Sequence, residues 1–214
     1  MRTLLQILRH FERLIAKIFG YGLVFLTKFF KYVYVAELAS LIPFRLGNDA
    51  RYLFYKRTLS RCGEDVTINF GTILSYPEIT IGNHCWIGTY NIVGLADLGD
   101  YTLTAQGCHI VSGAHTHYFD RTDIPIMKQA GSPSRCSIGP DVWIGAGSVI
   151  MANVGRGCVI GAGSVVTKHI PDWSVAAGNP TRVIRQRLLS GCEMRASAEK
   201  AADPSISSSH LDSL

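Results

Sequence analysis

The residues best suited to chemistry lie together in one polar stretch, SGAHTHYFDRTDIPIMKQAG, which begins at Ser112. It carries His115 and His117 two positions apart. A neutral imidazole accepts a proton near pH 7, so either histidine could serve as a general base. Asp120 and Gln129 of the same stretch could bind hydroxyl groups or orient that base. We therefore expect the chemistry to take place at this stretch.

A six-residue repeat surrounds the histidine stretch and must hold it in place. Pairs of an aliphatic residue and a glycine follow one another at six-residue steps in Ile81-Gly82, Ile87-Gly88 and Val93-Gly94. Further members of such series are Leu98, Thr104, Ile110, Ile138, Ile144, Ile150, Val154, Ile160 and Val166. This period is neither helical nor the two-residue alternation of an ordinary strand. It predicts a triangular solenoid in which about 18 residues complete a coil.

Each aliphatic residue of the repeat should point inward and stack on its counterpart in the next coil, while the glycine relieves crowding where the backbone bends. The interval from Ile110 to Ile138 is not a multiple of six, so the histidine stretch must leave the coil as a loop. Loops on a rigid scaffold often carry binding and catalytic residues. The step from Ile150 to Val154 is two residues short and predicts a shortened corner.

The first 19 residues have apolar residues at helical spacing, with Arg9, Arg13 and Lys17 between them. The longest uncharged stretch that follows, residues 18–27, is about half of the roughly 20 residues that a spanning helix needs. We expect residues 1–44 either to lie on an anionic membrane surface or to pack their apolar face on the protein or a sister subunit. Residues 48–59 are expected to form a short connecting helix with a basic face.

The composition favours one catalytic domain with an appendage. The net charge is +5, and six of the basic residues fall in the first 31 positions rather than along a face of the main domain, which favours an anionic membrane over nucleic acid as a partner. None of the six cysteines forms a CxxC pair, so reduced, partly buried thiols are expected. With no clean secretory signal in the sequence, we expect a cytoplasmic protein with peripheral contact at the inner face of the membrane. The cysteines are Cys62, Cys85, Cys108, Cys136, Cys158 and Cys192.

These residues resemble the hexapeptide-repeat acyltransferases, in particular the galactoside, maltose and bacterial polysaccharide O-acetyltransferases. The resemblance covers about residues 62–187 and rests on the hexads, the histidine loop after Ser112-Gly113, DVWIGAGSVI from Asp141, and GAGSVVTKHIP followed by AAGNPTRVIRQR. The hexads alone indicate only the fold. The closing GNPTRVIR segment and the Thr-Lys pair before it make the acyl-CoA class specific.

The resemblance implies an all-β fold, a left-handed parallel β-helix, with an N-terminal amphipathic helical segment and a short C-terminal helix or tail. We expect a helical segment in residues 1–60, the acyltransferase domain in residues 61–187 and a flexible tail in residues 188–214. It also implies a homotrimer with each active site in the cleft between two subunits.

The resemblance further implies roles for individual residues. His115 would be the general base, with His117 as its close rival. Thr167 and Lys168 would contact acetyl-CoA, and Arg182 and Arg185 would lie near its phosphates, unless they only form a solvated helix face. Small residues would leave the prism surface open to the pantetheine arm: Ala146, Gly161 and Ala162.

For other polar and aromatic residues, the sequence supports a role in the active site less strongly. Asn91, Asp120 and Gln129 are candidates for binding acceptor hydroxyls. Trp86 and Trp143 hold corresponding positions before an inward isoleucine and are expected to pack at a wall or an interface. Structural roles are expected for three further histidines: His84, His109 and His169.

The expected reaction is direct transfer of an acetyl or other acyl group from acyl-CoA to a hydroxyl of a sugar or polysaccharide precursor. An N-acyltransferase for an amino sugar is the nearest alternative. A zinc-dependent carbonic anhydrase on the same prism would pair two histidines five positions apart, a layout that His109, His115 and His117 do not have. We therefore expect no metal. The remaining alternative is a non-catalytic scaffold at a membrane.

Overall fold

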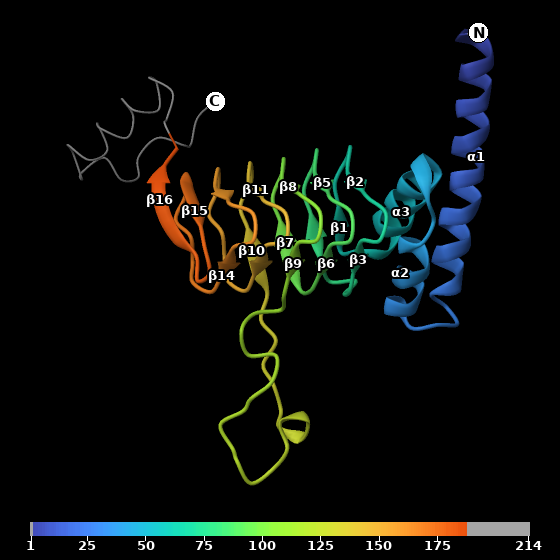
Figure 1. Ribbon diagram of the computed structural model, residues 1–214. Coiled ribbons are helices and arrows are strands. Elements are labelled where there is room, and N and C mark those ends of the chain that lie inside the picture. The colour runs from blue at the N-terminus through green and yellow to red at the C-terminus, as the bar shows by residue number, and fades with distance from the viewer. Residues whose placement is uncertain (1, 188–214) are drawn as a thin grey trace, which may run out of the picture.

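Two parts make up the structure, a computed structural model that describes residues 2–187. Three helices come first and form the helical cap: α1 (Arg2–Leu26), α2 (Tyr32–Ser40) and α3 (Phe44–Thr58). Short strands then coil around one axis and form the prism, residues 61–187 (Figure 1). The predicted left-handed parallel β-helix is confirmed.

The prism has three sheets, and the strands from β1 to β12 enter sheets A, B and C in turn. Sheet A contains β1 (Arg61–Cys62), β4 (Thr80–Ile81), β7 (Ala96–Leu98) and β10 (Cys136–Ile138). Sheet B contains β2 (Thr67–Ile68), β5 (Trp86–Ile87), β8 (Leu103–Thr104), β11 (Trp143–Ile144), β13 (Val159–Ile160), β15 (Ser174–Ala177) and β16 (Arg182–Gln186). Sheet C contains β3 (Ile73–Leu74), β6 (Ile92–Val93), β9 (His109–Ile110), β12 (Val149–Ile150) and β14 (Val165–Val166).

The core follows the predicted repeat. In sheet B the inward residues Ile87, Thr104, Ile144 and Ile160 lie in register on neighbouring parallel strands and are buried. Fully burying an aliphatic side chain of this size stabilises a fold by about 1.5–3 kcal/mol. The stacked interior positions therefore hold the coils together.

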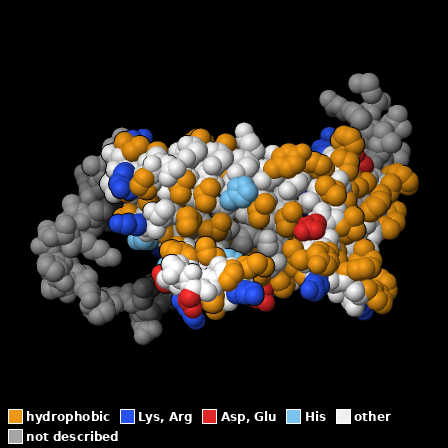
Figure 2. Space-filling view, turned by 60° about the horizontal axis from the view of Figure 1, so that its bottom comes forward, with side chains coloured by type: hydrophobic (Ala, Val, Ile, Leu, Met, Phe, Trp, Pro, Cys, Tyr) orange, Lys and Arg blue, Asp and Glu red, His pale blue; other side chains and the backbone are white. Residues whose placement is uncertain are grey.

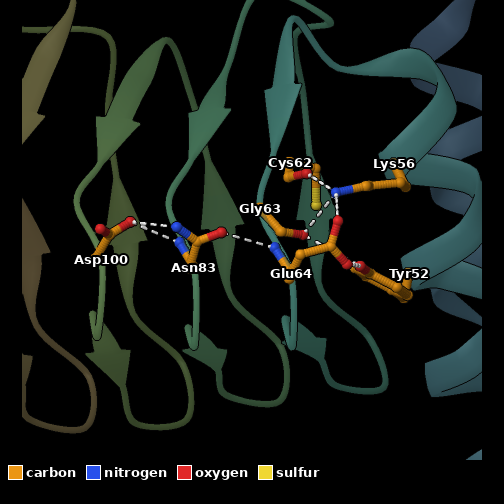
Figure 3. A network of polar contacts seen from close by, with 7 residues as sticks. All are labelled: Tyr52, Lys56, Cys62, Gly63, Glu64, Asn83 and Asp100. Atoms are coloured by element: carbon orange, nitrogen blue, oxygen red, sulfur yellow. Dashed lines mark hydrogen bonds and ion pairs between the residues drawn. The ribbon is translucent and has the colours of Figure 1, made fainter.

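The A–B corner, between sheets A and B, shows why the repeat needs glycine. A Cβ atom on Gly82 would collide with the Asp100 carboxylate of the next coil. That carboxylate accepts a hydrogen bond from the Asn83 amide (2.7 Å), and Asn83 Oδ1 in turn accepts one from the Glu64 amide (2.9 Å) (Figure 3). The corner thus links three consecutive coils through polar side chains.

The shortened corner predicted after Ile150 is present, and it has a simple form. Val154 forms isolated parallel β-bridges with Ile138 of sheet A and with Ile170. Only the three residues between Ile150 and Val154 therefore turn the C–A corner, between sheets C and A. Asn153 fixes that turn, because its Oδ1 accepts from the Ser137 amide (2.9 Å) and its backbone carbonyl accepts from the Ile170 amide (3.0 Å).

The helical cap closes the N-terminal end of the prism. The buried Arg51 of α3 donates from Nε to the Ile68 carbonyl (2.9 Å), from Nη1 to the Ile42 carbonyl (2.7 Å) and from Nη2 to Asn48 Oδ1 (2.6 Å). Burial lowers the pKa of Arg51 to about 10, so the guanidinium still carries its charge at neutral pH. Nearer the surface, Lys56 Nζ reaches the Cys62 carbonyl (2.6 Å) and the Glu64 carboxylate (2.9 Å) (Figure 3).

The last described strand corrects one expectation. Residues 182–186 form β16, which pairs antiparallel with β15, so the alternative in which Arg182 and Arg185 only form a helix face is wrong. The predicted tail, residues 188–214, and with it Cys192, lies outside the described residues. Within residues 2–187 no helix combines the length and the apolar character that crossing a bilayer requires.

Candidate active site

Residues 111–135 form the histidine arm, which leaves the prism after β9 and returns at β10. Figure 1 shows the arm projecting away from the prism axis. Its two limbs pair through backbone hydrogen bonds from Ser134 to Ser112 (2.8 Å), from Ser132 to His115 (2.7 Å) and from Tyr118 to Ala130 (2.7 Å). The predicted loop is confirmed, and the pairing fixes the part of it that carries both histidines.

Glycines let the two limbs approach each other closely beside the histidines. Gly113 has a φ of +77°, a conformation that residues with a Cβ rarely adopt. A Cβ on Gly131 would collide with the Thr116 carbonyl of the opposite limb. The side chains of His115 and His117 are exposed on this narrow part of the arm and are available to a ligand or a neighbouring subunit.

Gln129 holds the outer turn of the arm. Its Nε2 donates to the carbonyls of Arg121 (2.7 Å) and Ile124 (3.2 Å), and its Oε1 accepts from the Arg121 amide (3.3 Å). The side chain is buried, and its polar atoms are committed to the loop backbone. The expected contact of Gln129 with an acceptor is therefore replaced by a structural role, whereas Asp120 is exposed on the arm.

The structure also corrects the assignment of Asn91, which is only 1% exposed inside the prism. Its Nδ2 donates to Thr104 Oγ1 (2.6 Å), and its Oδ1 accepts from the Cys108 amide (2.6 Å). Neither polar atom of the side chain is left to contact an acceptor. Asn91 instead ties its own coil to the next one, which contains both Thr104 and Cys108.

Thr167 and Lys168 lie at the corner from which the histidine arm leaves. They follow β14 directly, as Val111 and Ser112 follow β9, and β12 lies between these two strands. Neighbouring strands of a sheet are about 4.8 Å apart, so the pair is about 10 Å from the base of the arm. Both side chains are exposed.

The other proposed coenzyme residues gather at the B–C corner, between sheets B and C. Ala146 and Ala162 lie in register in adjacent coils, where the Gly163 amide donates to the Ala146 carbonyl (2.8 Å). Gly161 lies against Ala177 of the following coil. Arg182 pairs with Ala177 across β15 and β16 and is exposed there, and Arg185 pairs with Val175 on the same strands.

The candidate residues therefore form two groups on opposite edges of sheet C. The histidine arm, Thr167 and Lys168 lie at the C–A corner, and the small residues with Arg182 lie at the B–C corner. Within the described chain, sheet C therefore separates the two groups.

An apolar ladder on sheet B was only partly foreseen from the sequence. Trp86 and Trp143 point outward and are each 51% exposed, and Leu103 lies between them on β8. With Asn69 and Gln106 they line a shallow depression of about 280 Å³. The repeat could have predicted that Leu103 joins the two tryptophans, because Leu103 precedes the inward Thr104 as Trp86 precedes Ile87.

His84 and the cysteines contact the scaffold. His84 Nδ1 lies 3.2 Å from the Asp65 carboxylate, and the His84 ring stacks on Tyr101. The described cysteines are free and buried, and burial raises the pKa of Cys62 to about 12. Among residues 2–187 no three histidine, cysteine or acidic side chains form a group that could hold a metal ion.

In comparison with known proteins, one segment of the prism matches a family model. Residues 135–168 match the family described as bacterial transferase hexapeptide (six repeats). A probable acetyltransferase of Mycobacterium tuberculosis, Rv3034c, is 32% identical over 171 residues, which are 79% of this chain. The chain spans only about half (52%) of the length of that relative.

Solved structures share the fold. AntD, an N-acyltransferase from Bacillus cereus in complex with dTDP and 3-hydroxybutyryl-CoA, is 25% identical with a TM-score of 0.54, over 68% of this chain and 81% of AntD. A maltose O-acetyltransferase from Clostridium difficile 630 is 24% identical with a TM-score of 0.57, over 77% of this chain and 89% of that one. The second likeness shows the fold alone.

Proposed function

The chain is a left-handed β-helix protein with the hexapeptide repeat of bacterial transferases, and on this basis we propose that it is an acyl-CoA-dependent O-acyltransferase. One observation carries the proposal. The prism places an exposed histidine arm and the Thr167-Lys168 pair at the same corner, about two coil steps apart. A proton acceptor and a cation for a coenzyme phosphate are the groups that acyl transfer from a thioester needs.

In the proposed reaction, His115 acts as the general base. The neutral imidazole removes the proton of the acceptor hydroxyl as its oxygen attacks the thioester carbonyl. The tetrahedral intermediate then expels the coenzyme A thiolate, which takes up that proton from the imidazolium. The ester and free coenzyme A are the products. His117 is the alternative base on the same limb of the arm.

Acetyl-CoA is the proposed acyl donor. Complexes with coenzyme A derivatives are described for AntD, and this likeness supports a similar donor here. Lys168, Arg182 and Arg185 are exposed cations that suit the phosphates of the coenzyme. The small residues Ala146 and Ala162 leave room for the pantetheine arm along the B–C corner.

A homotrimer would complete the site. Because the two groups of residues lie on opposite edges of sheet C, the C–A corner of one subunit can face the B–C corner of the next. The exposed hydrophobic tip of the arm, Ile126 and Met127, then has a surface to cover it. Light scattering tests the assembly, and an active monomer would contradict it.

The proposed acceptor is a sugar hydroxyl, and the proposed location is the cytoplasm, where the free, buried cysteines would stay reduced. A second candidate is acylation of a sugar amine, which the likeness to the N-acyltransferase AntD favours. Both reactions use the same coenzyme and base. They differ in the product, because an ester is cleaved by mild alkali and an amide is not.

The test combines coenzyme binding with turnover. Calorimetry should detect binding of coenzyme A, and Lys168→Ala should weaken it while Arg156→Ala, an exposed cation at the A–B corner, should not. Matched sugars with a hydroxyl or an amine at one position, incubated with acetyl-CoA, should show by mass spectrometry which group is acylated. Failure to bind coenzyme A at all would contradict the proposed function.

A further inference from the structure

The side of α1 that packs on the protein includes two small residues. Ala16, Gly20 and Leu23 are buried against α3, one or two helical turns apart. A Cβ on Gly20 would come within 2.6 Å of the Leu53 side chain, so the helices approach each other closely there. Packing on α3 therefore uses only a narrow stripe of α1.

The large apolar residues of α1 point the other way. Phe11 and Ile18 are 61% and 65% exposed, and Leu14 and Phe25 on the same side are also exposed by more than half. A helix whose only task was to close the prism would bury these side chains. Large exposed apolar side chains continue through the link between α1 and α2, through α2 and up to the start of α3: Phe29, Phe30, Tyr34, Leu38, Leu41 and Phe44. We call this continuous region the α1–α2 surface.

A groove of about 470 Å³ runs between α1 and α2 within this surface. Its lining is almost entirely apolar and includes Ile18, Phe19, Leu26, Leu38 and Ile42. Figure 2 shows hydrophobic side chains over much of this end of the molecule. Scattered apolar side chains are normal on a protein surface, but a contiguous region of this extent marks an interaction site.

The charge around the α1–α2 surface is strongly positive. Residues 2–45 contain seven lysines and arginines but only Glu12 and Glu37 as acidic residues. No ion pair in the described part of the chain engages Arg9, Arg13 or Lys17. Lys28 lies over the Phe25 ring, 5.7 Å from its centroid, at the margin of the apolar region. Cations beside an exposed apolar helix face suit a surface that is apolar inside and anionic outside.

We propose that the α1–α2 surface docks the protein on an anionic lipid bilayer, with the apolar side chains in the interface and the lysines and arginines at the level of the phosphates. Figure 1 shows α1 lying across the N-terminal end of the prism. The bilayer would thus lie across that end, and the coils would stack away from it toward β16. In the proposed trimer of parallel prisms, the three α1–α2 surfaces would face the same bilayer.

Flotation with lipid vesicles tests the proposal on the full-length protein. Vesicles that contain phosphatidylglycerol should carry the protein at low salt at least about tenfold better than vesicles of phosphatidylcholine alone. The variant with Leu14→Ser, Ile18→Ser and Phe25→Ser should lose that binding. Its matched control is Ile184→Ser, which removes an exposed apolar side chain from β16 and should bind as the wild type does.

A second variant tests the charge without changing the apolar face. Lys17→Glu with Lys28→Glu should weaken binding by about fivefold or more for each position, and high salt should do the same to the wild type. Arg156→Glu, at the A–B corner, is the control. Unchanged thermal unfolding of each variant would show that the cap is still folded.

Three results would overturn the proposal: wild-type protein that ignores anionic vesicles, a serine variant that still floats, or binding that does not distinguish the two lipids. If light scattering showed a larger assembly that the serine variant loses, without vesicle binding, a second copy of the chain would be the partner instead. Vesicle binding by His115→Ala separates this proposal from catalysis, because docking should not depend on that side chain.

Discussion

The prism and the helical cap place their apolar residues in opposite ways. In the prism the aliphatic residue of each hexad is buried, as Ile144 is, and the smallest residues lie where coils crowd at the corners. In α1 two small residues, Ala16 and Gly20, face the protein, while Ile18 and Phe25 face outward. The same apolar residue types therefore stabilise the fold in one region and remain free for a partner in the other.

Substituting one isoleucine in each region tests this difference most directly. Ile144→Ala should lower the free energy of unfolding by about 2–5 kcal/mol, because it leaves a cavity in the closed interior. Ile18→Ala should change it by less than about 0.5 kcal/mol, because that side chain is 65% exposed. Denaturant unfolding of both variants measures the difference. Equal losses would mean that the outward face of α1 contributes to folding after all.

The junction between the two regions should show the next largest effect. Arg51→Met removes the donors for four backbone carbonyls and for Asn48, and these buried or partly buried acceptors lose a hydrogen bond each. We expect a loss on the order of 3 kcal/mol in the free energy of unfolding. Arg61→Met, which changes an exposed arginine of β1, is the control and should stay within about 0.5 kcal/mol of the wild type. Similar values for both variants would show that Arg51 does not couple the cap to the prism.

The smallest effect is expected at the surface ion pair of Figure 3. Hydrogen bonds from Lys56 and Tyr52 hold the pKa of Glu64 below its ordinary value. A carboxylate with a lowered pKa stabilises the folded state above its unfolded pKa, and this contribution is lost as the pH falls through the folded pKa. Glu64→Gln should therefore lower the Tm slightly at pH 7, and the difference from the wild type should shrink as the pH falls below the ordinary glutamate pKa of about 4.3. A difference that persisted in acid would show that the ion pair is not its cause.

The sequence predicts the prism well because the hexad repeat is a local rule that every coil obeys. It identifies the inward isoleucines, the departure of the histidine arm after Ile110 and the short corner after Ile150. It does not reveal that Asn91 and Gln129 are buried, because the type of a polar residue says nothing about whether its partners are backbone groups or a ligand. Their partners come from a neighbouring coil and from the far turn of the arm, and only the folded chain brings them together.

The helix-face alternative for Arg182 and Arg185 failed for a related reason. The run RVIRQ has no glycine or hexad spacing, and its arginines suggested a helix face. In the structure the open edge of β15 supplies hydrogen-bonding partners for this run, so pairing with the sheet overrides the local pattern. The sequence predicts that the first part of the cap is helical, but it does not predict which side of that helix is exposed. Helical spacing alone does not say which face of α1 packs on α3.

The most direct test of the proposed chemistry is steady-state acyl transfer by His115→Ala and His117→Ala, with coenzyme binding measured on the same preparations. We predict that His115→Ala lowers turnover by at least about a hundredfold, the usual scale for losing a general base, while the Kd for acetyl-CoA stays nearly unchanged. His117→Ala should cost less. A dead His117→Ala beside an active His115→Ala would move the base to the other histidine, and full activity of both variants would contradict histidine catalysis on the arm.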